Sequence, residues 1–192
     1  MEMGTAEYEF IYLRAALNLL ENYLLAKDLY WPINAKAPIG NPAYPLLTIG
    51  NLLLSLKRLQ AYSLTNDQQA ELTRIEEQLY SLQNRWRVAW EEKSSREFSA
   101  RLKLWRDFLE EYRSSPENHA DRYHYEISRR VLLELLRPQS GKLPPAEVEM
   151  LSGLDSLLFA RFIPGDFIWG TELINSFPPQ PYWYLYGTLK AG

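Results

Sequence analysis

The sequence predicts an all-α protein, built as an antiparallel bundle of about five or six helices. Apolar side chains recur every three or four residues through long stretches, which is the spacing that lines one face of a helix. Prolines and aromatic side chains gather in two segments, 30–45 and 164–192, which are therefore expected to lie outside the helices. Hydrophobic residues make up 46 % of the 192 residues, enough for a sizeable core. We expect residues 1–163 to form the helical bundle and residues 164–192 to form an aromatic flap packed on it within the same domain.

The first helix is expected over residues 5–29, with Thr5 as its N-cap. Its apolar stripe consists of Phe10, Leu13, Leu17, Leu20 and Leu24. Residues 30–45 contain four prolines and a glycine, so neither a helix nor a central strand is expected there. Because this segment also carries large apolar side chains, we predict an ordered Pro/aromatic loop that packs along the bundle.

A second helix is expected over residues 46–62, and Thr65 and Gln68 form a capping box before a helical pattern that runs over residues 67–113. One helix of that length would be about 70 Å long. A compact domain of this size is only roughly 40 Å across. Residues 94–97 read Ser-Ser-Arg-Glu, a second capping-box sequence, so we predict a break or kink near residues 93–96. The alternative is one unbroken helix, since no glycine or proline lies there.

Two further helices are expected before the flap. Ser115 and Pro116 form a typical helix start, and the pattern runs to Leu136, just before Pro138. The last clear helix opens at residues 144–147 and ends near Phe162.

The C-terminal flap is expected to be irregular or to form a short hairpin between residues 167–169 and 182–186. In an extended strand, side chains alternate between faces. That alternation would direct Trp183 and Leu185 inward and leave Tyr182, Tyr184 and Tyr186 half exposed.

Composition excludes several classes of site. The chain has no cysteine, which rules out disulfides, cysteine-ligated zinc, iron–sulfur clusters and a thiol nucleophile. Two histidines are too few for a three-histidine metal site. The formal charge of −3 does not favour nucleic acid as a partner. With no signal-like start and no long apolar run, a soluble, cytoplasmic protein without membrane attachment is expected.

Glu117, Asp121 and His124 are the best candidates for chemistry. Their spacing places two carboxylates and an imidazole on one helical face, which resembles half of a di-metal carboxylate site in a bundle. Glu21 of the first helix is a further acid for such a site. The pattern occurs only once, however, and acids near a helix N-terminus also complement its dipole. We therefore expect no catalytic residue, no cofactor and no tightly bound transition metal.

A basic stretch covers residues 85–106, with seven basic side chains against three acidic ones. Trp86, Trp90 and Trp105 are interleaved with it, a combination that can bind single-stranded nucleic acid. These tryptophans fall on the apolar stripe, so we expect them to be buried and the charges to form ion pairs on a solvated face. Nucleic acid is therefore an unlikely partner.

Aromatic residues outside the helices are candidates for an interface or a pocket. They are Trp31, Trp169, Tyr182, Tyr184 and Tyr186. Aromatic side chains dominate both cores and interfaces, so these residues either seal the core or form a docking surface.

Three functional hypotheses follow from these observations. The first is a non-catalytic interaction or assembly protein with a protein partner, or a homo-oligomer. The second is a small-molecule-binding or metal-dependent activity within the bundle. The third and weakest is nucleic-acid binding through residues 85–106.

Overall fold

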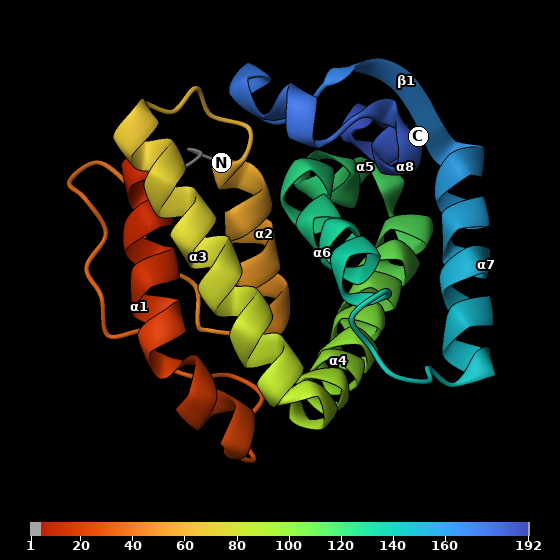
Figure 1. The fold of residues 1–192 in the computed structure, drawn as a ribbon. Helices are drawn as coiled ribbons and strands as arrows, with labels where there is room; N and C mark the ends of the chain where they lie inside the picture. Colours follow the sequence, from red (N-terminus) through yellow and green to blue (C-terminus); the bar gives the residue numbers. More distant parts are fainter. Residues whose placement is uncertain (1–4, 192) are drawn as a thin grey trace.

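The computed structural model describes residues 5–191. Helices make up 70 % of the structure, which confirms the predicted mainly helical class, and one two-stranded sheet is present (Figure 1). The described residues form eight α-helices, of which α5 and α8 span only four residues each. The α-helices are α1 Ala6–Leu25, α2 Ile49–Leu59, α3 Asn66–Arg85, α4 Arg87–Ser114, α5 Pro116–His119, α6 Tyr123–Leu136, α7 Pro145–Arg161 and α8 Pro179–Tyr182. The other elements are the 3-10 helices η1 Ala120–Arg122, η2 Thr171–Ser176 and η3 Trp183–Leu185 and the strands β1 Phe162–Phe167 and β2 Tyr186–Leu189.

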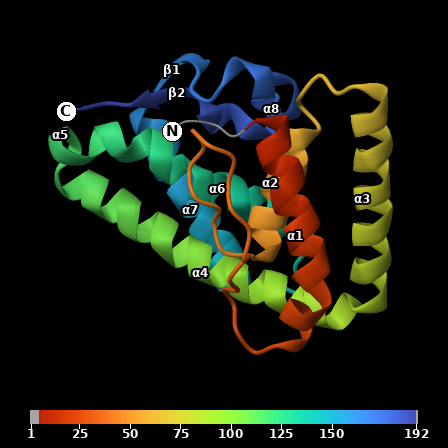
Figure 2. The ribbon, with the colours of Figure 1, turned by 90° about the vertical axis from the view of Figure 1, so that its left-hand side faces the viewer.

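The long helices pack in a series that differs from their order in the chain. Helix α3 contacts α1, α1 contacts α2, α2 contacts α6, α6 contacts α4, and α4 contacts α7. Figures 1 and 2 show α1, α2 and α3 in one half of the molecule and α4, α6 and α7 in the other, with the C-terminal segment lying over one end of the second half. The α2–α6 contact joins the two halves, together with the contacts of α4 with α1, α2 and α3. No helix in the described part of the chain is both long and apolar enough to cross a membrane.

Two of the predicted helix starts are confirmed in atomic detail. The Thr5 hydroxyl accepts a hydrogen bond from the Tyr8 amide at 3.2 Å. At α3, Gln68 N–H donates to the Thr65 hydroxyl at 3.3 Å while the Gln68 side chain accepts from Thr65 N–H at 3.0 Å, a complete capping box. Both caps satisfy backbone donors that a helix leaves unpaired at its N-terminus.

The predicted break near residues 93–96 is wrong. Helix α4 runs without interruption from Arg87 to Ser114, and the chain instead turns at Trp86, between α3 and α4. Ser94 is fully buried because it lies within the face of α4 that packs on its neighbours. Trp86 leaves helical geometry, with φ −113° and ψ 34°, and its indole N–H donates to Glu21 of α1 at 3.0 Å. A tertiary contact thus accompanies the turn.

The predicted helix from residue 116 to Leu136 starts where expected but is interrupted. Helix α5 ends at His119, the 3-10 turn η1 follows, and α6 begins at Tyr123. Of the three tryptophans expected in the core, Trp90 and Trp105 are buried and Trp86 is half-buried.

The Pro-rich loop lies against α1. An isolated antiparallel bridge joins Trp31 and Leu47, so the segment leaves and rejoins the bundle at one point. Inside it, the Tyr44 hydroxyl donates to the Tyr8 carbonyl at 3.1 Å, and the two rings lie 4.5 Å apart.

The C-terminal flap differs from the expected hairpin. Strand β1 pairs with β2 antiparallel, with Phe162 opposite Leu189 and Pro164 opposite Gly187. Gly187 has φ 150°, and a Cβ there would overlap the Ile163 carbonyl oxygen, so the close approach requires glycine.

The expected orientation of the aromatic run in the flap is wrong for Tyr182, Trp183 and Tyr184, whereas Leu185 is buried and Tyr186 half-buried as expected. Residues 179–185 form helical turns, Tyr182 and Tyr184 are buried, and Trp183 remains partly exposed. The Tyr184 carbonyl accepts a hydrogen bond from the Tyr123 hydroxyl at 2.6 Å, which fixes the flap on α6.

Candidate functional site

The structure does not gather Glu117, Asp121 and His124 into a site. Glu117 is exposed on α5 and accepts a hydrogen bond from the Ser115 hydroxyl at 2.7 Å, which holds the pKa of its carboxyl below the usual range. The His124 ring lies 3.3 Å from the Asp121 backbone carbonyl, not from its carboxylate. Within residues 5–191, no group of three or more acidic or histidine side chains is placed to hold a metal ion.

Glu21, the acid proposed to complete that site, has structural partners instead. It accepts from the Trp86 indole at 3.0 Å and lies 3.8 Å from the Arg85 guanidinium. These contacts place it at the α3–α4 turn.

The basic stretch largely forms local ion pairs. Arg87 pairs with Glu91 and Arg101 with Glu97, each one helical turn apart. Lys93 is buried, donates to the Asp28 carbonyl, and therefore offers no surface charge.

The five aromatic candidates do not converge on one surface. Trp169, Tyr182 and Tyr184 are 7 %, 5 % and 0 % exposed, so their side chains are largely inaccessible from outside. Trp31 and Tyr186 are half-buried. None of the five lines the cavity described next.

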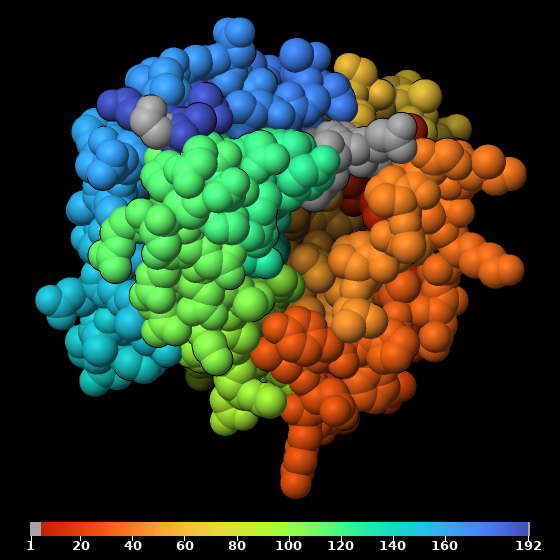
Figure 3. Space-filling view, turned by 180° about the vertical axis from the view of Figure 1, so that it is seen from behind, coloured from red at the N-terminus to blue at the C-terminus, as the bar shows by residue number. Residues whose placement is uncertain are grey.

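A cavity of about 340 Å³ opens where the two halves of the molecule meet. Figure 3 shows the hollow between the green surface of α4 and α6 and the orange surface of the Pro-rich loop. The side chains around it come from α1, the Pro-rich loop, α2, α4 and α6. They are Tyr8, Glu9, Tyr12, Pro42, Ala43, Pro45, Asn51, Leu54, Ser55, Arg58, Arg101, Ser128 and Leu132. This volume falls at the lower end of the range typical of small-molecule sites, about 300–1,000 Å³.

Helix α2 supplies four of these residues from one face. Asn51, Leu54, Ser55 and Arg58 are spaced three and four residues apart, so the helix presents them as one stripe beside its apolar face. Helix α1 contributes Glu9, which is 1 % exposed. Two neighbouring helices thus place a carboxylate, Glu9, and a guanidinium, Arg58, in the lining of the cavity.

Glu9 is buried with only half of its carboxylate hydrogen-bonded. Its Oε2 accepts from the Ser55 hydroxyl at 2.6 Å, and its Oε1 has no hydrogen-bond partner among residues 5–191. The Arg58 Nη1 atom is 3.9 Å from Oε1, too far for a hydrogen bond. Burial raises the pKa of the Glu9 carboxyl, and the nearby Arg58 charge and the Ser55 hydrogen bond oppose that shift only in part.

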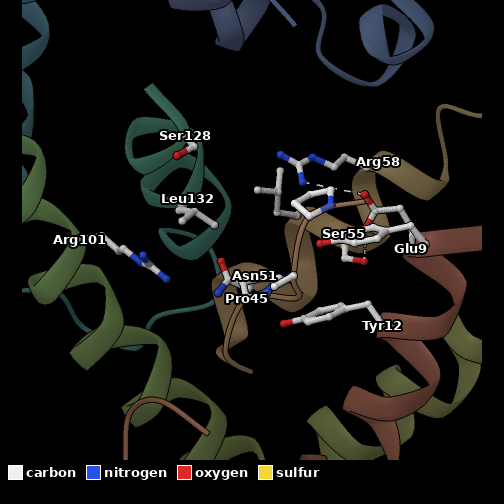
Figure 4. Close-up of a pocket in the computed structure, with 13 residues that line it drawn as sticks. Glu9, Tyr12, Pro45, Asn51, Ser55, Arg58, Arg101, Ser128 and Leu132 are labelled. Atoms are coloured by element: carbon white, nitrogen blue, oxygen red, sulfur yellow. Dashed lines mark hydrogen bonds and ion pairs between the residues drawn. The ribbon is translucent and has the colours of Figure 1, made fainter. Parts of the chain in front are cut away.

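Arg58 is the complementary group. Its guanidinium stacks over the Trp169 ring, 5.3 Å from the ring centre, and its buried Nε has no hydrogen-bond partner. Leaving such a donor unpaired in the interior is costly. Glu9 and Arg58 therefore line one cavity, and their unpaired buried atoms do not hydrogen-bond to each other (Figure 4).

Arg101 reaches the cavity from the opposite side (Figure 4). Its Nε and Nη2 donate to Glu97 Oε1 at 3.2 and 3.1 Å. Glu97 is fully buried, and its Oε2 accepts from the Gly50 amide in the first turn of α2 at 2.8 Å. A Cβ on Gly50 would lie 2.7 Å from the Glu97 carboxylate, so glycine allows this approach. Glu97 thus fixes Arg101 relative to α2.

The remaining walls are apolar or weakly polar. Leu54, Leu132 and Pro45 contribute hydrocarbon surface, and the Tyr12 hydroxyl donates to the Leu46 carbonyl at the rim at 3.4 Å. Apolar walls with a few convergent polar groups are typical of small-molecule sites. Glu9 and Arg58 were missed as site residues by the sequence interpretation, and Arg101 appeared only within the basic stretch 85–106.

A scan against protein-family models found no match for the chain, and neither a search of curated proteins nor a search of solved structures found one. The residues of the cavity are therefore the basis for a functional proposal.

Proposed function

We propose that the protein binds a small molecule in the cavity between α1, α2, α4 and α6. The observation that carries this proposal is that Glu9 and Arg58 both line the cavity, while the buried atoms Glu9 Oε1 and Arg58 Nε have no hydrogen-bond partner among residues 5–191. A fold that has no use for these groups gains stability by replacing them with apolar side chains. Their retention beside an open cavity supports a binding role, the second of the three functional hypotheses.

A ligand in this cavity would contact both halves of the molecule. Arg101 and Ser128 line it from α4 and α6, and Asn51 and Arg58 line it from α2. Binding should therefore stabilise the α2–α6 contact and raise the unfolding temperature by mass action.

A fragment screen by ligand-observed NMR tests this function. Ser128→Trp places a large ring in the cavity wall and should abolish binding of the fragments that the unaltered protein binds. Ser81→Trp is the matched control, since Ser81 is an exposed helical serine on α3 outside the cavity lining, and it should leave the hits unchanged. Equal loss in both variants, or an absence of hits with the unaltered protein, would refute the proposal.

The interaction hypothesis has a weaker basis. Three of its five aromatic residues are buried within this chain, and what supports it is limited to Trp31 and Tyr186. Trp31→Ser and Tyr186→Ser should each change the oligomeric state, measured by analytical ultracentrifugation, only if these side chains bind a second copy.

A further inference from the structure

Arg58 has hydrogen-bonding capacity that the described part of the chain does not use. An arginine carries five N–H donors in a planar fork that matches carboxylate and phosphate oxygens. The Arg58 side chain is only 15 % exposed, yet it makes no hydrogen bond within residues 5–191. Its one ion-pair partner in the described part of the chain is Glu9, at 3.9 Å. A guanidinium in this state, lining a cavity, is suited to an oxyanion.

Arg101 adds a second positive charge on the far wall. Its Nε and Nη2 are used by Glu97, and Nη1 makes no hydrogen bond in the described structure. Asn51 lies between the two arginines in Figure 4 and adds an amide to the lining, whose Nδ2 already donates to the Leu46 carbonyl at 2.9 Å. Donors thus converge on one volume from two helices that belong to different halves of the molecule.

The charges near the cavity balance only while Glu9 is ionised. Glu97 pairs with Arg101, and among residues 5–191 Glu9 is the only acid that forms an ion pair with Arg58. When Glu9 is protonated, the lining gains one net positive charge. A bound anion can then supply the negative charge beside Arg58 that Glu9 no longer carries. Binding of an anion and protonation of Glu9 should therefore favour each other.

From this geometry we propose that the cavity binds a small molecule carrying a carboxylate or phosphate, with the oxyanion on Arg58 and the apolar body against Leu54 and Leu132, and that Glu9 takes up a proton on binding. The inference rests on the proposed function and adds the chemical class of the ligand.

Burial raises the pKa of the Glu9 carboxyl above its ordinary value, which favours proton uptake by this group. The ionisable groups that surround it are Arg58 on α2, Tyr8 and Tyr12 on α1, Tyr44 in the Pro-rich loop, Tyr62 after α2, and Arg101 across the cavity on α4. Burial raises the pKa of all four tyrosines, so they stay neutral near pH 7. Arginine stays charged throughout.

Isothermal titration calorimetry with three probes tests the ligand class. Benzoate and phenyl phosphate carry the two oxyanions, and benzamide has the shape of benzoate without its charge. We expect benzamide to bind on the order of tenfold more weakly than the better anion, because charge-assisted hydrogen bonds are the stronger ones. Whichever anion binds more tightly identifies the source as a carboxylate or a phosphate.

Variants test the residues. Arg58→Gln should weaken anion binding about tenfold or more, and Arg58→Lys should fall between it and the unaltered protein. Arg85→Gln is the matched control: Arg85 also lies beside a glutamate, Glu21 at 3.8 Å, and stacks on a tryptophan, Trp86 at 5.6 Å, but it is exposed and outside the cavity. The Arg85→Gln variant should bind both anions with the same affinity as the unaltered protein. Circular dichroism confirms that each variant is folded.

Proton uptake is tested with benzoate, which stays ionised between about pH 5.5 and 8. The unaltered protein should bind it more tightly as the pH falls, and Glu9→Gln should remove that dependence.

These experiments distinguish an incorrect ligand class, the oxyanion, from an incorrect function, small-molecule binding in the cavity. Equal binding of benzoate and benzamide, or equal weakening by Arg58→Gln and Arg85→Gln, overturns the oxyanion assignment and leaves small-molecule binding intact. No binding by either anion while Ser128→Trp still abolishes fragment hits also overturns the class alone. Tight anion binding without pH dependence overturns the role of Glu9.

Discussion

Two arginines of this protein, Arg130 buried and Arg58 half-buried, differ sharply in how their hydrogen-bond donors are used. Arg130 on α6 donates to both carboxylate oxygens of Asp155 on α7, at 2.8 and 3.0 Å, and to Glu134 at 2.9 Å. Its guanidinium also lies 4.7 Å from the centre of the Tyr184 ring. Arg58 makes no hydrogen bond in the described residues and has one acid at 3.9 Å.

This difference in hydrogen bonding indicates a structural role for Arg130 and a binding role for Arg58. Arg130 joins α6, α7 and the C-terminal flap, and two carboxylates and an aromatic face occupy it, so it has little capacity left for a ligand. Arg58 lies beside the Glu9 carboxylate and over the Trp169 indole, but these contacts leave its Nε and the Glu9 Oε1 without a hydrogen bond in the described residues. A charged side chain whose hydrogen-bond donors are all paired stabilises the fold. One with unpaired donors beside a cavity can bind a ligand.

Replacing Arg130 should have the largest effect. Arg130→Met leaves Asp155 and Glu134 without their cation and removes the contact to Tyr184, so the free energy of unfolding should fall by about 3–5 kcal/mol. Urea denaturation measures this loss. Arg129→Met, at the neighbouring and more exposed position, is the control and should cost less than about 1 kcal/mol. A loss below that value for Arg130→Met would contradict the structural role.

Replacing both Glu9 and Arg58 should raise the free energy of unfolding, opposite to the effect of replacing Arg130. The double variant Glu9→Gln/Arg58→Met eliminates both unsatisfied buried charges, so we expect a gain of about 1–2 kcal/mol in unfolding free energy. The same urea experiment on Asp155→Asn/Arg130→Met should show a loss. If both double variants lose stability alike, the two arginines do not differ as proposed.

A smaller, pH-dependent difference should appear in Glu9→Gln alone. The pKa of Glu9 is raised in the folded state from its ordinary value of 4.5, so between these two values the native protein binds more protons than the unfolded chain. Stability of the unaltered protein relative to Glu9→Gln should therefore fall as the pH rises above 4.5 and level off once Glu9 is ionised in the folded state. A difference that stays constant with pH would show that Glu9 has the same pKa folded and unfolded.

The smallest effect is expected at the hydroxyl of Tyr184. This atom is buried and has no hydrogen-bond partner, whereas the ring carries the contact with Arg130. Tyr184→Phe keeps the ring, so thermal unfolding should change by less than about 0.5 kcal/mol. Tyr184→Leu removes the ring and should cost more. Equal losses would assign the contact to the hydroxyl.

The helical class and two helix starts could be predicted because they depend on local chemistry. Thr5 and the Thr65–Gln68 pair cap the helices that follow them within three residues. The sequence at 94–97 looks the same locally, but the Glu97 carboxylate accepts from the Gly50 amide in the first turn of α2 and from the Arg101 side chain, and residues 94–97 lie inside α4. Glu97 does cap a helix, one that lies 47 residues away in the chain.

The flap and the cavity depend on contacts between distant segments. Period-2 alternation fails at residues 182–186 because Tyr123 and Arg130 of α6 hold Tyr184 inward. The signal for the cavity was present: Glu9 lies one turn before Leu13, on the buried stripe of α1, and a polar residue on such a stripe is informative. Its partner Arg58 could not be identified without knowing that α2 packs on α1.

The stacking of Arg58 on Trp169 gives the cavity an optical reporter. Indole emission depends on the electric field at the ring, and the Arg58 charge lies 5.3 Å from the ring centre. An anion that neutralises or shifts this charge should therefore change the emission maximum of Trp169 without any added dye. In a chain whose other five tryptophans are replaced by phenylalanine, that shift would follow cavity occupancy directly and in real time.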